Sequence, residues 1–255
     1  MTRASLALAR RALFNALRRP QFLAPLVIFP TLFLAVNTGG LNRTTSLPGF
    51  PAVDGFLDFQ LAAAITQSLL LGGVGTGIAA ALDIESGFFD RLVASPIPRA
   101  AIVLGRILAS AAIAVLQVAW FLVLGMIFGV EPKGGVLGLL LVLVIGVLAG
   151  AGFGALGVFL ALRARNASTV QGLFPIVFVI LFASSAFFPA DLLSSPADVV
   201  AAYNPLSYIA DGIREPIAFG RAAAPILEGI AAAAGLTALT VGASVLALRG
   251  RLGET

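Results

Sequence analysis

Cysteine and histidine are absent from this chain of 255 residues, and Lys133 is its only lysine. Their absence excludes a disulfide, a thiolate nucleophile, a Cys/His metal site and a Ser-His dyad. A phosphate-binding P-loop needs a lysine between glycine and Ser or Thr, whereas Lys133 lies in the segment EPKGG. The chain therefore has no P-loop of its own, and we expect neither a catalytic centre nor a resident cofactor.

Charged residues are also scarce. They make up 11% of the chain, against about 25% in an average soluble domain. Apolar residues make up 59%, and the mean hydropathy is +1.04. This composition is too apolar for a water-soluble globule and indicates a helical membrane protein.

Six apolar stretches reach or approach the roughly 20 residues that a membrane-spanning helix needs. The sequence predicts an all-α polytopic fold, one membrane domain over 1–255, with both termini on one side. The first span is short and contains Pro25 and Pro30, which membrane helices tolerate when neighbours satisfy the freed carbonyl groups. The predicted spans are 21–38, 59–82, 102–129, 136–162, 167–188 and 225–248.

The basic residues indicate the orientation, because cytoplasmic segments of membrane proteins carry an excess of Lys and Arg. Four basic residues fall on one side of the predicted spans: Arg43, Lys133, Arg214 and Arg221. The other twelve fall on the side of both termini, which is therefore predicted to be cytoplasmic: Arg3, Arg10, Arg11, Arg18, Arg19, Arg91, Arg99, Arg106, Arg163, Arg165, Arg249 and Arg251. The net charge of +4 is thus a topology signal, and we expect no nucleic-acid partner.

The segment 1–20 alternates arginine with apolar residues and lacks the uninterrupted apolar core of a signal peptide. Leu6, Leu13 and Leu17 share one face of a predicted helix. Such a helix can rest at the headgroup level of a bilayer beside anionic lipid. A simple topology anchor is the alternative.

The predicted cytoplasmic loop 83–99 contains acids, two phenylalanines and an arginine. Ile84, Phe88 and Leu92 follow helical spacing, and Pro96 ends the pattern. An exposed amphipathic helix of this kind is a docking site for a soluble partner or a helix lying on the membrane surface.

The predicted external segment 189–224 is interrupted by four prolines, and 206–213 forms a helix too short to span. This pattern fits re-entrant helices that cover an outward opening, or an ordinary amphipathic loop.

Two phenylalanine stripes and three mid-span glutamines are candidates for a substrate path. The stripes lie on the first span (Phe22, Phe29, Phe33) and on the fifth (Phe174, Phe178, Phe182), and the glutamines are Gln67, Gln117 and Gln171. Packing against lipid or neighbouring helices is the alternative role. Arg106 and Glu228 lie near span ends, where their charges can snorkel to the interface.

The chain resembles the ABC-2-type permeases, the membrane subunits of one class of ATP-binding-cassette exporters, and most closely their daunorubicin-resistance branch. The first similar stretch, 75–109, matches through Glu85, Gly87, Arg91, Leu92, Ser95, Pro96, Arg99, Gly105 and Arg106. The second, 187–215, matches through Phe188, Pro189, Pro196, Asn204, Pro205, Leu206, Tyr208 and Arg214. One departure is that Ala197 and Asp198 stand where an aromatic residue often follows the second proline.

The resemblance implies the type V exporter fold in a bacterial plasma membrane, with a coupling helix in 83–99 and re-entrant helices in 189–215. The coupling helix would contact a separate ATPase subunit, which binds ATP and Mg, through Glu85, Ser86, Gly87, Phe88, Phe89, Asp90, Arg91 and Leu92. The external gate would include Pro189, Asn204, Pro205 and Tyr208. Two permease and two ATPase copies would assemble, and the substrate path would contain Phe29, Phe33, Gln67, Gln171, Phe174, Phe178 and Phe182.

The resulting prediction is an exporter of a lipophilic drug, antibiotic or lipid. The chain has 19 Phe but one Trp and two Tyr, whereas sugar exporters often stack substrate on Trp and Tyr. A polysaccharide- or glycolipid-exporting permease is the nearest alternative. An ion-coupled carrier or channel is a further one, although the predicted spans lack the buried carboxylate that such carriers usually show.

Overall fold

The computed structural model describes residues 2–253, apart from the side chains of residues 20, 22, 174, 252 and 253. This part of the chain is helical and contains no β-strand, so the predicted all-α class is confirmed. Five of its helices are long and apolar enough to cross a membrane. They are α2 (Pro20–Leu41), α3 (Phe56–Glu85), α5 (Arg99–Ile127), α6 (Gly135–Ala164) and α11 (Ala223–Gly253).

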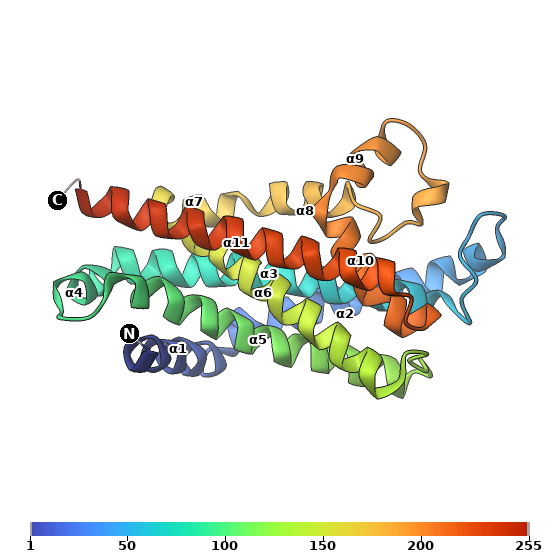
Figure 1. Cartoon of the computed structure of the whole chain (residues 1–255), viewed down its shortest axis with the longest axis horizontal. Helices are drawn as coiled ribbons and strands as arrows, with labels where there is room; N and C mark the ends of the chain where they lie inside the picture. Colours follow the sequence, from blue (N-terminus) through green and yellow to red (C-terminus); the bar gives the residue numbers. More distant parts are fainter. Residues whose placement is uncertain (1, 254–255) are drawn as a thin grey trace.

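The fifth predicted span, 167–188, is wrong as one continuous helix. The chain forms two short helices there, α7 (Ala167–Gly172) and α8 (Phe174–Phe182), which run in succession along the bundle (Figure 1). Pro175 lies in the first turn of α8. Proline has no N–H to donate to the preceding turn and disfavours helical backbone in the residue before it, which accounts for the break.

Helix α3 lies at the centre of the bundle and contacts α2, α5, α6 and the short helix α10 (Pro205–Arg214). Two of its glycines, Gly73 and Gly77, meet Gly157 of α6. A Cβ atom on Gly157 would lie 2.1 Å from the carbonyl oxygen of Gly73. The backbones of α3 and α6 therefore approach as closely as small residues allow.

A second face of α6 packs on α5 through glycines spaced four residues apart. Gly146, Gly150 and Gly154 lie against Val118, Ala114 and Ser110, respectively. Ser110 also donates a hydrogen bond of 2.9 Å to the Gly150 carbonyl oxygen. The repeat thus lets α6 approach two helices at once.

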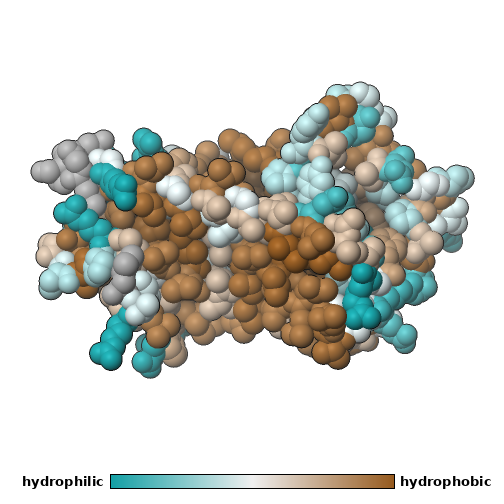
Figure 2. Space-filling model, viewed as in Figure 1, coloured by the Kyte–Doolittle hydropathy of each residue, from teal (hydrophilic) through white to brown (hydrophobic). Residues whose placement is uncertain are grey.

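The two ends of the bundle differ. Helices α1 (Thr2–Leu17) and α4 (Phe88–Ala94) lie at the end where α11 finishes, hereafter the α4 end (Figure 1). The opposite, α9 end carries the loop 42–55, α9 (Ala197–Tyr203) and the π-helical turn Glu215–Phe219. Figure 2 shows a broad hydrophobic belt between hydrophilic ends on the visible face, which is the surface pattern of a membrane-embedded bundle.

Helix α1 packs on α5 through small residues. Its buried residues are Ser5 and Ala9, and a Cβ atom on Gly105 of α5 would lie 2.6 Å from the Cβ of Leu8. Leu6 and Leu17 remain exposed. The predicted N-terminal helix therefore exists, docks beside α5 and keeps part of its apolar surface free.

Candidate functional site

The predicted coupling segment 83–99 does not form one continuous helix. Helix α3 continues to Glu85, and α4 begins only at Phe88. Between them Gly87 has φ of 67°, a left-handed conformation that glycine adopts without steric cost. The predicted face of Ile84, Phe88 and Leu92 is therefore divided between two helices.

Helix α4 turns one of its two phenylalanines inward. Phe89 is only 5% exposed, packs into the apolar cluster at the α4 end and carries the Arg251 guanidinium 4.6 Å from its ring centre. The predicted contact of Phe89 with an ATPase stays a prediction, and in the structure its buried ring anchors α4 to the bundle. Phe88 is half-buried, with the Arg11 guanidinium 3.7 Å from its ring centre, and Leu92 is half-buried as well.

The charged members of the predicted contact set are exposed. Asp90 is 67% exposed and lies 3.4 Å from Arg251, and Arg91 extends near the Phe88 ring. Ser86 is also exposed. Glu85 is exposed too, but its Oε1 accepts a hydrogen bond of 2.8 Å from the Ala167 backbone N–H at the start of α7. Glu85 therefore joins α3 to α7, whatever else it contacts.

The two phenylalanine stripes meet between α2 and α8. The rings of Phe29 and Phe178 are 5.6 Å apart and perpendicular, and those of Phe33 and Phe182 are 5.8 Å apart. Phe187 joins them at 5.3 Å from Phe33. Edge-to-face pairs at these distances are favourable aromatic contacts. The side chain of Phe174 lies outside the described part.

The glutamines have different environments. Gln67 is fully buried, and neither its Oε1 nor its Nε2 has a hydrogen-bond partner among the described residues. Gln117 donates to the carbonyl oxygen of Ser68 at 2.8 Å and to its hydroxyl at 3.0 Å, and thereby links α5 to α3. Gln171 is exposed on α7. Among the three predicted glutamines, Gln67 is thus the buried one whose amide oxygen and nitrogen both lack a described partner.

The predicted gate residues hold the short helices at the α9 end. Asn204 accepts from the Leu206 N–H and caps α10, while its Nδ2 donates to the Ile180 carbonyl oxygen of α8 at 2.7 Å. Pro205 occupies the first turn of α10, where its missing N–H costs nothing. The Tyr208 hydroxyl donates to the Ala202 carbonyl oxygen at 2.8 Å, and Pro189 is buried.

Arg214 is a buried cation whose role the sequence does not reveal. It is 4% exposed and pairs with Asp211. It also donates to the carbonyl oxygens of Phe59 at 3.2 Å and Ala186 at 2.6 Å. Burial raises the pKa of Asp211 above its usual range, and the Arg214 charge opposes that rise. Arg214 thus connects α10, the start of α3 and the segment after α8.

A second ion cluster lies at the α4 end. Asp83 of α3 pairs through one oxygen with both Arg11, at 3.1 Å, and Arg106. The Arg106 side chain is 13% exposed. Arg106 thus lies near the α4 end of α5 and has an acidic partner on the neighbouring helix. Asp83 and Arg106 lie on either side of the connection between α3 and α5. That position in the sequence is the signal from which their ion pair could have been predicted.

Comparison of the sequence with protein families identifies the family of this chain. The profile of the ABC-2 type transporter family matches residues 3–217, most of the chain, so the chain belongs to that family. The family consists of membrane-spanning transport permeases, which are not themselves enzymes.

Two relatives carry the name "Putative transport permease ycf38". The protein from Porphyra purpurea is 27% identical over 210 residues, covering 82% of this chain and 72% of that protein. The protein from Pyropia yezoensis is 27% identical over 216 residues, with the same coverage of each chain.

Proposed function

We propose that this chain is the membrane subunit of an ATP-driven exporter, and that α4 receives the motion of a separate ATPase subunit. The observation that carries the proposal is the construction of α4. Gly87 sets it off from α3, Phe89 anchors it in the α4-end cluster, and Asp90 and Arg91 face outward. An anchored helix with exposed charges can transmit a push to α3 and α5.

The proposed topology has six crossings, with α7 and α8 together forming the fifth in chain order, and both termini in the cytoplasm. The twelve arginines assigned to that side support this orientation. A bacterial plasma membrane, a second permease copy and two ATPase copies complete the proposed assembly.

We further propose a lipophilic substrate, such as a drug, an antibiotic or a lipid, that passes near the phenylalanine contacts of α2 and α8. The unpaired amide of Gln67 is the polar group suited to orient it. The helices α9 and α10 would cover the outward opening. Export of a polysaccharide or glycolipid is the alternative within the same family.

The test combines the purified chain with a candidate ABC ATPase subunit. Asp90→Lys combined with Arg91→Glu reverses both exposed charges of α4 without changing the net charge. We expect the double variant to lose co-purification with the ATPase and substrate-stimulated ATP hydrolysis. Asp191→Lys combined with Arg221→Glu makes the same exchange at exposed positions outside α4 and should retain both.

Normal stimulation in the α4 variant would contradict the proposal. Uptake by purified permease under an ion gradient, with no ATPase present, would favour an ion-coupled carrier instead. Glu85 is avoided as a test position because its bond to α7 gives it a structural role.

A further inference from the structure

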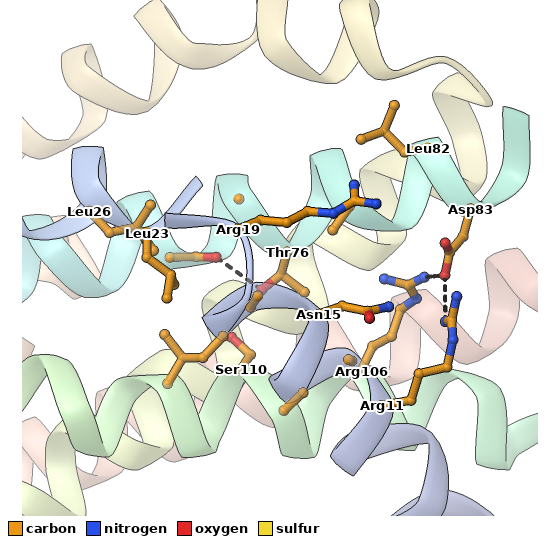
Figure 3. A pocket seen from close by; sticks show the side chains of 17 residues that line it. Arg11, Asn15, Arg19, Leu23, Leu26, Thr76, Leu82, Asp83, Arg106 and Ser110 are labelled. Atoms are coloured by element: carbon orange, nitrogen blue, oxygen red, sulfur yellow. Dashed lines mark hydrogen bonds and ion pairs between the residues drawn. The ribbon is translucent and has the colours of Figure 1, made fainter. Parts of the chain in front are cut away.

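A cavity of about 160 Å³ opens between α1, α2, α3 and α5 near the α4 end (Figure 3). Its polar part is lined by Arg11, Asn15, Arg19, Asp83 and Arg106. In Figure 3, Arg11 and Arg106 point toward Asp83 from two helices, and Arg19 extends along the pocket from the connection between α1 and α2. Four separate segments thus bring these polar side chains to one place.

The charges in this cavity do not balance. Three arginines face one aspartate, so the lining carries a net charge of +2. Asp83 is shared by Arg11 and Arg106 through a single oxygen, and the Arg19 side chain has no ion pair or hydrogen bond with the described residues 2–253. The cavity therefore has guanidinium donors available for an anion.

The cavity continues into an apolar groove. A second cavity of about 170 Å³ is lined by the same Leu23, Leu26 and Ile113, and extends along α2 and α5 to Trp120. From Arg106 to Trp120, α5 rises about 21 Å at 1.5 Å per residue. One leaflet of a bilayer's hydrocarbon core is about 15 Å thick, half of the roughly 30 Å total. The groove is thus long enough to hold a chain across one leaflet.

We propose that this groove binds one anionic glycerophospholipid, with its phosphate at Arg19 and Arg11 and an acyl chain along α2 and α5. The planar guanidinium fork matches a phosphate in shape and charge. A zwitterionic headgroup adds a cation that the positive cavity does not favour. The site is distinct from α4 and from the phenylalanine contacts of α2 and α8, so it does not depend on the proposed export function.

The first experiment compares phosphatidylglycerol with phosphatidylcholine on the purified full chain by native mass spectrometry. Arg19→Gln removes an exposed, unpartnered charge and leaves the fold's described contacts intact. We expect it to weaken phosphatidylglycerol binding about tenfold, the effect of losing one charge-assisted hydrogen bond. Arg18→Gln is the matched control, because Arg18 is also exposed at the adjacent position but does not line the cavity. It should change binding less than about twofold.

The second experiment tests the chain-binding part. Ile113→Trp fills the position common to both cavities and should also weaken phosphatidylglycerol binding, with the thermal stability of the chain measured alongside. Glycerol 3-phosphate, which has no acyl chain, should not displace the lipid at equal concentration. Four outcomes would each overturn the proposal. The first two are an equal loss of binding in Arg18→Gln and Arg19→Gln, and equal binding of phosphatidylglycerol and phosphatidylcholine. The others are unchanged binding in a folded Ile113→Trp variant and displacement of the lipid by glycerol 3-phosphate.

Discussion

The guanidinium of Arg214 lies 3.9 Å from the centre of the Phe59 ring, and its Nε donates to the carbonyl oxygen of the same residue at 3.2 Å. The two residues are 155 positions apart in the chain. One side chain therefore contacts both the ring and the backbone of Phe59, through cation–π attraction and a charge-assisted hydrogen bond. This double contact fixes α10 to the beginning of the central helix α3.

Replacing Arg214 by methionine should destabilise the fold strongly. The change leaves the carboxylate of Asp211, which is 44% exposed, without its cation and leaves the carbonyl oxygens of Phe59 and Ala186 without a donor. Each buried carbonyl group left without a donor costs about 1–3 kcal/mol. Thermal unfolding in detergent should show a large fall in the melting temperature, and the exposed Arg221→Met should show almost none. A melting temperature unchanged by Arg214→Met would mean that the contact with Phe59 contributes little.

Gly157→Ala should separate α3 from α6. Its Cβ would lie 2.1 Å from the Gly73 carbonyl oxygen, so the two backbones must move apart. Overpacking of this kind costs about 1–3 kcal/mol. Gly235→Ala on α11 is the control, since a Cβ there has no atom within 4 Å and should leave stability equal or slightly higher. Equal stability of the two variants, measured by thermal unfolding, would contradict the close approach.

Gly87→Ala should strain the junction between α3 and α4. No atom lies within 4 Å of the added Cβ, so the effect isolates the left-handed backbone at φ of 67°. We expect a loss of about 1 kcal/mol and faster limited proteolysis near α4. Gly87→Asn should lose less, because asparagine tolerates this conformation better. If alanine and asparagine behave like glycine, the junction is not held in the left-handed state.

The buried glutamines Gln67 and Gln117 should respond in opposite directions to replacement by leucine. Gln67→Leu removes an unpaired buried amide and should raise stability by about 1 kcal/mol. Gln117→Leu breaks two hydrogen bonds to Ser68 and should lower stability by a similar amount. Substrate-stimulated activity should fall in Gln67→Leu if its amide contacts substrate. A loss of stability in Gln67→Leu equal to that in Gln117→Leu would show that Gln67 is bonded after all.

Hydropathy predicted most of the fold. Five of the six predicted spans are long helices, because a run of about 20 apolar residues has few alternatives in a membrane. Even Pro25 and Pro30 lie within the continuous helix α2. Hydropathy did not reveal the break before Phe174, because α7 and α8 are as apolar together as one helix would be. Backbone hydrogen bonding near Pro175, and not burial, determines that interruption.

The polar contacts were harder to predict, since each depends on which helices become neighbours. Arg106 could be recognised as a charge near a span end, but its pairing with Asp83 requires the antiparallel arrangement of α3 and α5. Arg214 donates to backbone oxygens of Phe59 and Ala186, which no residue pattern marks. Helical spacing placed Phe88 and Phe89 on different faces of α4 but could not show which face would be covered by the bundle.

Aromatic ring contacts join α2 directly to α8. Within the described residues, no hydrogen bond or ion pair connects these two helices. Inside a bilayer, a phenylalanine ring that loses its contact with another ring contacts lipid acyl chains instead. These chains are as apolar as the ring, so no hydrophobic penalty opposes the replacement of ring–ring by ring–lipid contacts. Separation of α8 from α2 would also break no hydrogen bond between them. The seam between Phe29, Phe33, Phe178 and Phe182 can therefore part sideways without the loss of a hydrogen bond, and under the proposed export function it would admit a molecule directly from the surrounding lipid.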